Sequence, residues 1–205
     1  MINQNFVILG ALLNLIGSST YAYNTLKGDT KPNRVSWFLW ATVPMIAFFA
    51  QIGEGVSLYT ALMTFMVGFG PMLVLSASLL NKKSYWKISK LDYVCGGLSI
   101  LAVVLWLATG TGLIAIALSI LADLLAGIPT LTKAFKDPSS EHHSVFRNGA
   151  LSAIITMLTI KEWTFASYAF SLYIFIICAI LYLLIRFKFG IMIATRYSLK
   201  KDNQH

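Results

Sequence analysis

The sequence predicts an all-α, multi-pass membrane protein in which seven transmembrane helices form two parallel three-helix bundles and a linker helix. Three observations predict this fold: the composition, the number of long apolar stretches and the placement of the basic residues. Of 205 residues, 57% are hydrophobic and 12% are charged, with a mean hydropathy of +0.72. Soluble domains carry about 25% charged residues, so the composition argues against a cytosolic enzyme, a nucleic-acid binder or a disordered tail.

Membrane-spanning length is the first criterion for dividing the chain. A hydrocarbon core of about 30 Å is crossed by roughly 20 apolar helical residues, and seven stretches meet this requirement: 5–25, 35–52, 56–80, 91–109, 111–132, 144–160 and 166–187. No positively charged segment precedes the first stretch, so we expect a retained helix rather than a signal peptide. The expected organisation is a first repeat over 1–81, a linker with the fourth span over 82–110, a second repeat over 111–187 and a basic tail over 188–205.

The basic residues alternate between the two ends of these spans. Fifteen of the sixteen Lys and Arg residues lie in the first, third and fifth connections, at the start of the sixth span, or in the tail, and only Lys161 lies at the other end. Cytoplasmic loops carry the excess of Lys and Arg, which predicts an external N-terminus and a cytoplasmic C-terminus. We expect an integral protein of the cell (inner) membrane, with the lipid bilayer as its surroundings.

An internal repeat relates the first and fifth spans. The segments Leu26–Asn33 and Thr132–Ser139 each follow an apolar span and carry Lys and Pro at the same spacing. Three crossings reverse the direction of the chain, so one additional crossing is needed before a second triplet can have the same orientation as the first. The fourth span supplies it, which predicts a parallel repeat about an axis along the membrane normal.

Two proline positions carry a resemblance to a known superfamily. The segment Gly127–Lys133 is similar to the proline-containing end of the first helix in a SWEET triplet, and Pro44 lies in the second helix, where such families also carry a proline. In architecture the chain resembles the SWEET and PQ-loop superfamily over nearly its whole length, and bacterial nicotinamide riboside transporters share this helix arrangement. The first span lacks the matching proline, Ser152 stands near the place of Pro44 in the sixth span, and there is no Pro-Gln pair. The resemblance therefore implies a fold and small-solute transport, without sugar specificity.

Polar residues follow one face of six of the seven spans, at the spacing of helical neighbours. The fourth span is almost wholly apolar after Ser99, as expected for a peripheral linker. Two interpretations fit these stripes: a wet cavity between the bundles, or close packing of helices through small and hydroxyl residues. On the first interpretation the candidate substrate-binding residues are Trp40, Asn148, Asp123, Asn14, Trp37, Ser18 and Ser152.

Asp123 is the most informative of these residues because it lies near the middle of the fifth span. A carboxylate at this depth is costly unless it is paired, hydrated or protonated, so Asp123 is the candidate for proton coupling or substrate contact. A purely structural carboxyl is the alternative. Trp40 and Trp37 can stack on a ring-shaped solute, although tryptophan is also common at membrane interfaces. Under the repeat, Asn148 has a depth similar to that of Trp40, and the two are expected to face each other.

Prolines interrupt three spans without ending them. Pro44, Pro71 and Pro129 each remove a backbone hydrogen bond, and they are candidate hinges or static kinks. His142 and His143 lie in a polar loop with acidic residues; we interpret them as polar surface, and we predict neither a metal nor a cofactor.

Taken together, these features favour a small-solute transporter with a central site between the two repeats. The solute is expected to be a sugar, a vitamin or nucleoside, or a similar polar metabolite, moved by uniport or by proton-linked transport through Asp123. The alternative is a non-transporting sensor or partner-binding protein on the same fold, and a homo-oligomer is compatible with either. An enzyme is not expected, because the chain shows no hydrolase elbow, zinc motif or deeply placed histidine. A retinal protein is excluded because residues 166–185 contain no lysine.

Overall fold

Helices alone make up the regular structure of the described residues. The computed structural model describes residues 2–53, 58–109, 112–161 and 163–193. Seven α-helices and one short 3₁₀ helix occur there: α1 (Phe6–Lys27), α2 (Arg34–Gly53), α3 (Leu58–Leu80), α4 (Lys90–Thr109), α5 (Gly112–Lys136), η1 (Pro138–Ser140), α6 (Ser144–Thr159) and α7 (Phe165–Phe187). The prediction of an all-α chain is confirmed.

Each of the seven apolar stretches coincides with one helix. The main difference is at α5, which continues about one turn past the expected end at 132 to reach Lys136. Three of the described helical segments are long and apolar enough to cross a membrane, namely Phe6–Lys27, Leu62–Leu80 and Tyr168–Phe187. The predicted starts of the third and fifth spans, at 56 and 111, and most of the tail lie outside the described residues.

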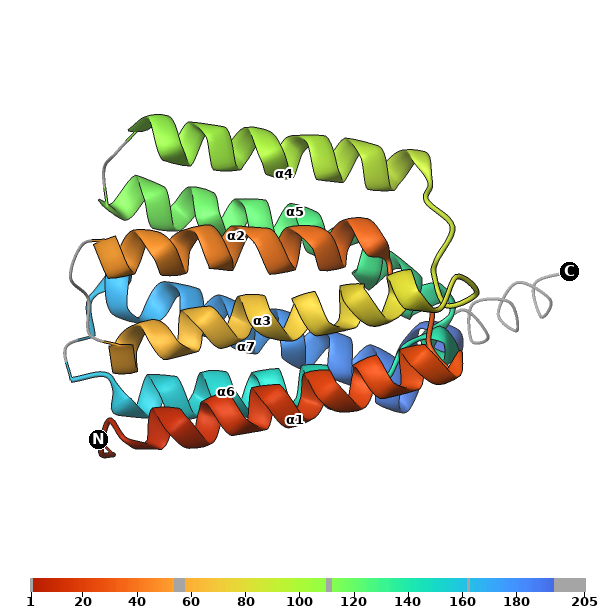
Figure 1. Cartoon of the computed structure of the whole chain (residues 1–205), viewed down its shortest axis with the longest axis horizontal. Helices are drawn as coiled ribbons and strands as arrows, with labels where there is room; N and C mark the ends of the chain where they lie inside the picture. Colours follow the sequence, from red (N-terminus) through yellow and green to blue (C-terminus); the bar gives the residue numbers. More distant parts are fainter. Residues whose placement is uncertain (1, 54–57, 110–111, 162, 194–205) are drawn as a thin grey trace, which may run out of the picture.

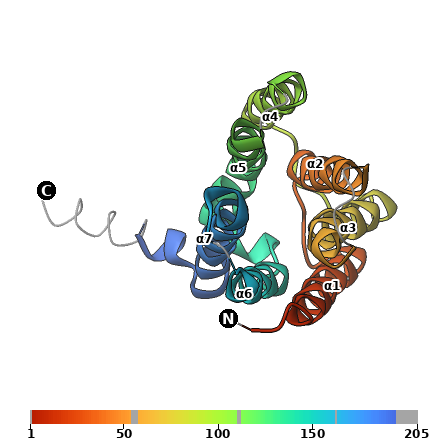
Figure 2. The ribbon, with the colours of Figure 1, turned by 90° about the vertical axis from the view of Figure 1, so that its left-hand side faces the viewer.

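The helices form two groups of three that share one arrangement (Figure 1). In the first group α3 packs between α1 and α2, and in the second group α7 packs between α5 and α6. Seen from one end, α1 lies against α6 and α2 against α5, so the six helices form a ring with α3 and α7 on opposite sides (Figure 2). Helix α4 lies outside this ring and packs mainly against α5.

The outward faces of the helices are apolar. On α1 the side chains of Leu12 and Ile16 are 50% and 56% exposed, and on α4 those of Ile100 and Val104 are 55% and 53% exposed. Soluble monomers rarely expose large contiguous apolar patches. These faces, together with the three long apolar helices, are consistent with an integral membrane protein.

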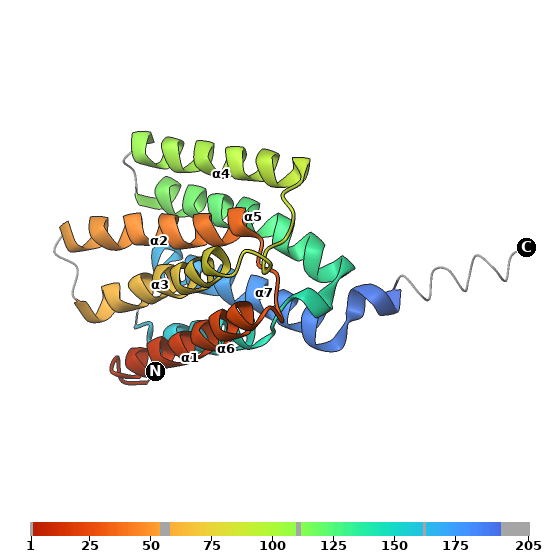
Figure 3. The ribbon, with the colours of Figure 1, turned by 45° about the vertical axis from the view of Figure 1, so that its right-hand side comes forward.

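The basic connections gather at one end of the ring. The α1–α2, α3–α4 and α5–α6 connections all lie there (Figures 1 and 3), and we call it the loop end. Helix α1 ends there at Gly28, whose positive φ of 93° places it in the left-handed conformation that suits glycine as a helix cap. The Asn33 side-chain oxygen caps the start of α2 by accepting hydrogen bonds from the backbone N–H groups of Val35 and Ser36.

Candidate functional site

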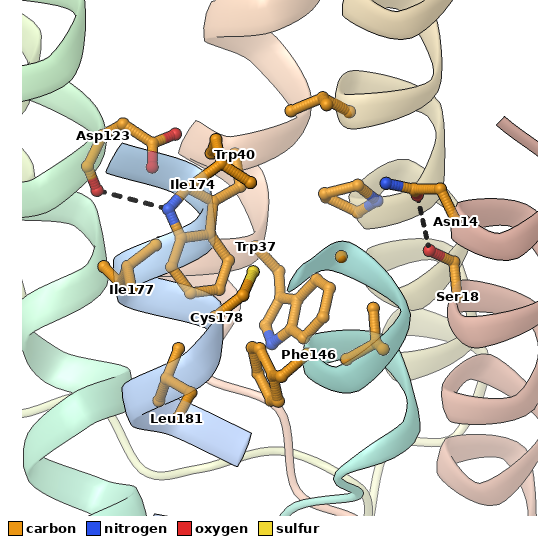
Figure 4. Close-up of a pocket in the computed structure, with 14 residues that line it drawn as sticks. Asn14, Ser18, Trp37, Trp40, Asp123, Phe146, Ile174, Ile177, Cys178 and Leu181 are labelled. Carbon is orange, nitrogen blue, oxygen red and sulfur yellow. Dashed lines mark hydrogen bonds between the residues drawn. The ribbon is translucent and has the colours of Figure 1, made fainter. Parts of the chain in front are cut away.

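A cavity of about 80 Å³ lies inside the ring, between the two groups of helices. It has room for several water molecules. All six ring helices contribute to its lining, which is largely apolar. The polar and aromatic lining residues that bear on its chemistry are Asn14, Ser18, Trp37, Trp40 and Asp123 (Figure 4).

Helical spacing explains how α1 and α2 deliver their side chains to this cavity. Asn14 and Ser18 are one turn apart on α1, and the Ser18 hydroxyl donates a 3.4 Å hydrogen bond to the Asn14 side-chain oxygen. Trp37 and Trp40 are three residues apart on α2, with ring centroids 5.5 Å apart and an interplanar angle of 83°. This edge-to-face arrangement is a preferred geometry for aromatic pairs.

Asp123 enters the cavity from α5 and is 5% exposed. Its Oδ2 accepts a 2.7 Å hydrogen bond from the Tyr173 hydroxyl on α7. The Trp40 indole N–H donates to the Asp123 main-chain oxygen at 3.3 Å, which fixes the ring beside the carboxyl group (Figure 4). Tyr173 could not be identified from the sequence pattern, because its contact with Asp123 depends on how α7 is rotated against α5.

Aromatic rings form the floor of the cavity on the side of the loop end. The Trp37 ring lies 4.8 Å from that of Tyr21 and 6.3 Å from that of Phe146, between centroids. The Trp37 indole N–H is buried and has no hydrogen-bond partner among the described residues. Leaving such a donor unpaired costs about 1–3 kcal/mol. An uncommitted donor therefore lies at the cavity floor.

A buried polar network lies beyond this floor and joins the two helix groups. Lys133 of α5 and Glu141 form an ion pair of 2.6 Å, with side chains 1% and 0% exposed. Glu141 also accepts a hydrogen bond from the Tyr21 hydroxyl of α1, and Lys133 donates to the main-chain oxygen of Lys31. The backbone N–H of Lys31 donates to the Ser140 oxygen at 2.8 Å. We call these residues (Tyr21, Lys31, Lys133, Ser140 and Glu141) the loop-end network.

Two of the predicted binding residues lie at the α1–α6 contact, away from the cavity lining. The Asn148 amide donates a 2.9 Å hydrogen bond to the Leu13 oxygen, and its side-chain oxygen accepts one of 3.0 Å from Arg147. The Ser152 hydroxyl lies 3.9 Å from the Met63 sulfur. Both side chains are buried, and neither lines the cavity. In this region the polar residues act as helix-packing groups, and Asn148 does not share the cavity lining with Trp40.

The three prolines lie inside helices that continue past them. Pro44 is in α2, Pro71 in α3 and Pro129 in α5. Of these, Pro71 lines the cavity. A helix interrupted beside the cavity can bend there more easily than an uninterrupted one.

His142 and His143 stack in the connection between η1 and α6, with ring centroids 5.0 Å apart. Burial is the first cause that lowers the pKa of both imidazoles, and the nearby Arg147 lowers it further. Glu141 of the same connection is committed to Lys133 and Tyr21. Within the described part of the chain, no three His, Cys, Asp or Glu side chains come together as a metal site requires.

Comparison with known proteins gave no relative: no protein-family model, curated protein or solved structure matches the chain.

Proposed function

We propose that the protein is a small-solute transporter whose substrate binds in the cavity between the two groups of three helices. One observation carries the proposal: the cavity lies between two groups of the same arrangement, and all six of their helices line it. Pockets with mostly apolar walls and a few convergent polar groups are the usual sites of small ligands. The shared arrangement also supports kinship with the SWEET and PQ-loop superfamily or the nicotinamide riboside transporters.

In this proposal all seven α-helices cross the membrane, with the N-terminus outside and the loop end in the cytoplasm. The support for this orientation is the gathering of the basic connections at one end of the ring. Helix α4 would then serve to restore the direction of the chain between the two groups, and its position outside the ring leaves the solute route to the other six.

The transport cycle would alternate the access of the cavity between the two ends of the ring. The loop-end network joins α1 and its loop to α5 and its loop, and the aromatic floor joins α1 and α2 to α6. Together they would close the path to the cytoplasm. Release to the cytoplasm would require the two groups to separate there, which breaks the contacts of Glu141 with Tyr21 and of Lys133 with Lys31. Bending at Pro71 would let α3 follow this movement beside the cavity.

The test uses the full chain in proteoliposomes and a panel of sugars, amino acids, nucleosides and vitamins. Uptake of a solute that depends on the protein is the expected result, and Trp40→Ala should abolish it. Trp163→Ala is the matched control because it removes the same side chain from a site that is 61% exposed and does not line the cavity. Solute binding without uptake would assign the protein to the sensor class instead, and equal uptake by both variants would place the site elsewhere.

A further inference from the structure

We propose that the cavity binds a small organic cation that carries a hydrogen-bonding group at its other end. This inference rests on the proposed function, because it names the class of solute that the same site would take. Three features of the cavity carry it: its charge, the aromatic rings beside that charge, and the neutral polar groups on the opposite wall.

The charge of the cavity comes from one carboxyl group. Asp123 is the only ionisable carboxyl, and no Lys, Arg or His side chain is present among the lining residues. In the described part of the chain the one ion pair is Lys133–Glu141, so Asp123 has no cationic partner there. The neutral hydroxyl of Tyr173 supplies a hydrogen bond at 2.7 Å but no compensating charge. A buried carboxylate is strongly disfavoured without such a charge, and a cationic head group would supply it.

The tryptophan rings favour an organic cation over a hydrated one. Indole faces attract ammonium groups, particularly where water is excluded. Trp40 is held beside Asp123 by its own N–H, which donates to the Asp123 main-chain oxygen, so its orientation does not depend on a ligand. A metal ion would instead need several oxygen ligands, and no cluster of three His, Cys, Asp or Glu side chains occurs in the described ranges.

The wall opposite Asp123 offers neutral hydrogen-bonding groups. Asn14 and Ser18 of α1 lie across the cavity from Asp123, and the Asn14 amide nitrogen is directed toward the interior (Figure 4). The Ser18 hydroxyl donates to the Asn14 oxygen, which orients the amide. An amide N–H donates to oxygen, so this end of the cavity suits a hydroxyl or carbonyl group on the ligand.

The experiment compares an organic cation with its uncharged isostere. The probes are choline, which joins a quaternary ammonium to a hydroxyl, and 3,3-dimethylbutan-1-ol, in which carbon replaces the nitrogen. Binding to the full chain in lipid nanodiscs is measured by titration calorimetry, with D-glucose as a neutral polar comparison. Choline is expected to bind at least tenfold more tightly than either neutral compound. The inference is overturned if choline binds no more tightly than 3,3-dimethylbutan-1-ol, or if neither compound binds.

Variants of Asp123 attribute the preference to its charge. Asp123→Asn should remove the preference for choline, whereas Asp123→Glu and Tyr173→Phe, which keep a carboxylate, should retain it. Melting curves establish that each variant is folded, and a full preference in folded Asp123→Asn also overturns the inference. Uptake separates this inference from the proposed function. Selective choline binding without choline uptake would support the ligand class and contradict the transporter function. Trp40-dependent uptake of neutral solutes alone would support the transporter function and contradict the ligand class.

Discussion

Replacing Glu141 by Gln should destabilise the folded protein by about 3–5 kcal/mol, because it leaves the Lys133 ammonium buried without its counter-charge. The structure supports the upper part of that range. Both side chains of the pair are essentially inaccessible, at 1% and 0% exposure, and their charged atoms are 2.6 Å apart. The remaining direct contacts of the Lys133 ammonium are a main-chain oxygen and the ring of Trp86 at 5.3 Å, and the Asp137 carboxylate nearby attracts it less strongly than Glu141 does.

The double variant distinguishes a charge effect from a loss of packing. Lys133→Met alone should cost a similar amount, because it leaves Glu141 buried with only the Tyr21 hydroxyl as a partner. Removing both charges together should cost at least about 2 kcal/mol less than the sum of the single costs, since no unpaired charge then remains. Lys136→Met is the matched control: it makes the same change at an exposed position of the same helix, and it should shift stability by less than about 0.5 kcal/mol.

The assay is reversible unfolding by sodium dodecyl sulfate in mixed micelles, followed by tryptophan fluorescence. The free energy of unfolding is measured for the full chain, both single variants, the double variant and the control. Single costs that add to the cost of the double variant within about 0.5 kcal/mol would show that the two side chains do not interact. That result would refute the assignment of Lys133 and Glu141 as a pair that holds the two helix groups together.

Three further predictions concern packing, pH and topology. Gly17→Ala should destabilise the protein by about 1–3 kcal/mol, because the new Cβ would lie 3.0 Å from the Cα of Val145 on α6. Gly97→Ala, where no atom lies within 4 Å of the new Cβ, should be neutral or stabilising by up to about 1 kcal/mol. Equal unfolding free energies of the two variants would contradict this prediction. The pKa values of His142 and His143 are lowered in the folded state, so the unfolded chain binds more protons and stability should fall as pH drops below about 6.5. A variant with Gln at both positions should lose less unfolding free energy between pH 7.5 and 5.5. An unchanged loss would exclude the imidazoles as its source. A reporter enzyme that is active only in the cytoplasm should be active when fused to the C-terminus, and one that is active only outside the membrane should be inactive there. Activity of the second reporter alone would reverse the proposed orientation.

The helices were predictable because each apolar stretch is long and is ended by charged or turn-forming residues. The end of α5 is the exception, and it shows the limit of that reasoning. By hydropathy Lys133 ends the fifth stretch, since a lysine normally leaves an apolar environment. In the structure α5 continues past it to Lys136, because Glu141 returns through η1 and neutralises the buried ammonium. Hydropathy gives no indication of such pairing, which depends on how the following connection folds.

The cavity was predictable only in part, for a similar reason. Polar residues on otherwise apolar helices pointed to Asn14, Ser18, Trp40 and Asp123, and the structure places all four around one cavity. The same pattern also selected Asn148, which instead bonds to the backbone of α1. Helical spacing identifies the face on which a polar side chain lies, but a face that packs on a helix and one that borders a cavity have the same spacing.

The two groups of helices differ most clearly at the loop end. Lys27 and Lys133 occupy equivalent places before Pro32 and Pro138, yet Lys27 is exposed over the Tyr23 ring and Lys133 is buried. After Pro32 the chain enters α2 almost at once, whereas after Pro138 it forms η1 and carries Glu141 beneath the cavity before α6 begins. This longer connection gives the second repeat an anion that the first repeat does not provide at the equivalent place. The two groups of helices thus share one packing arrangement but differ at the loop end, which is where the proposed transport cycle would change their contacts.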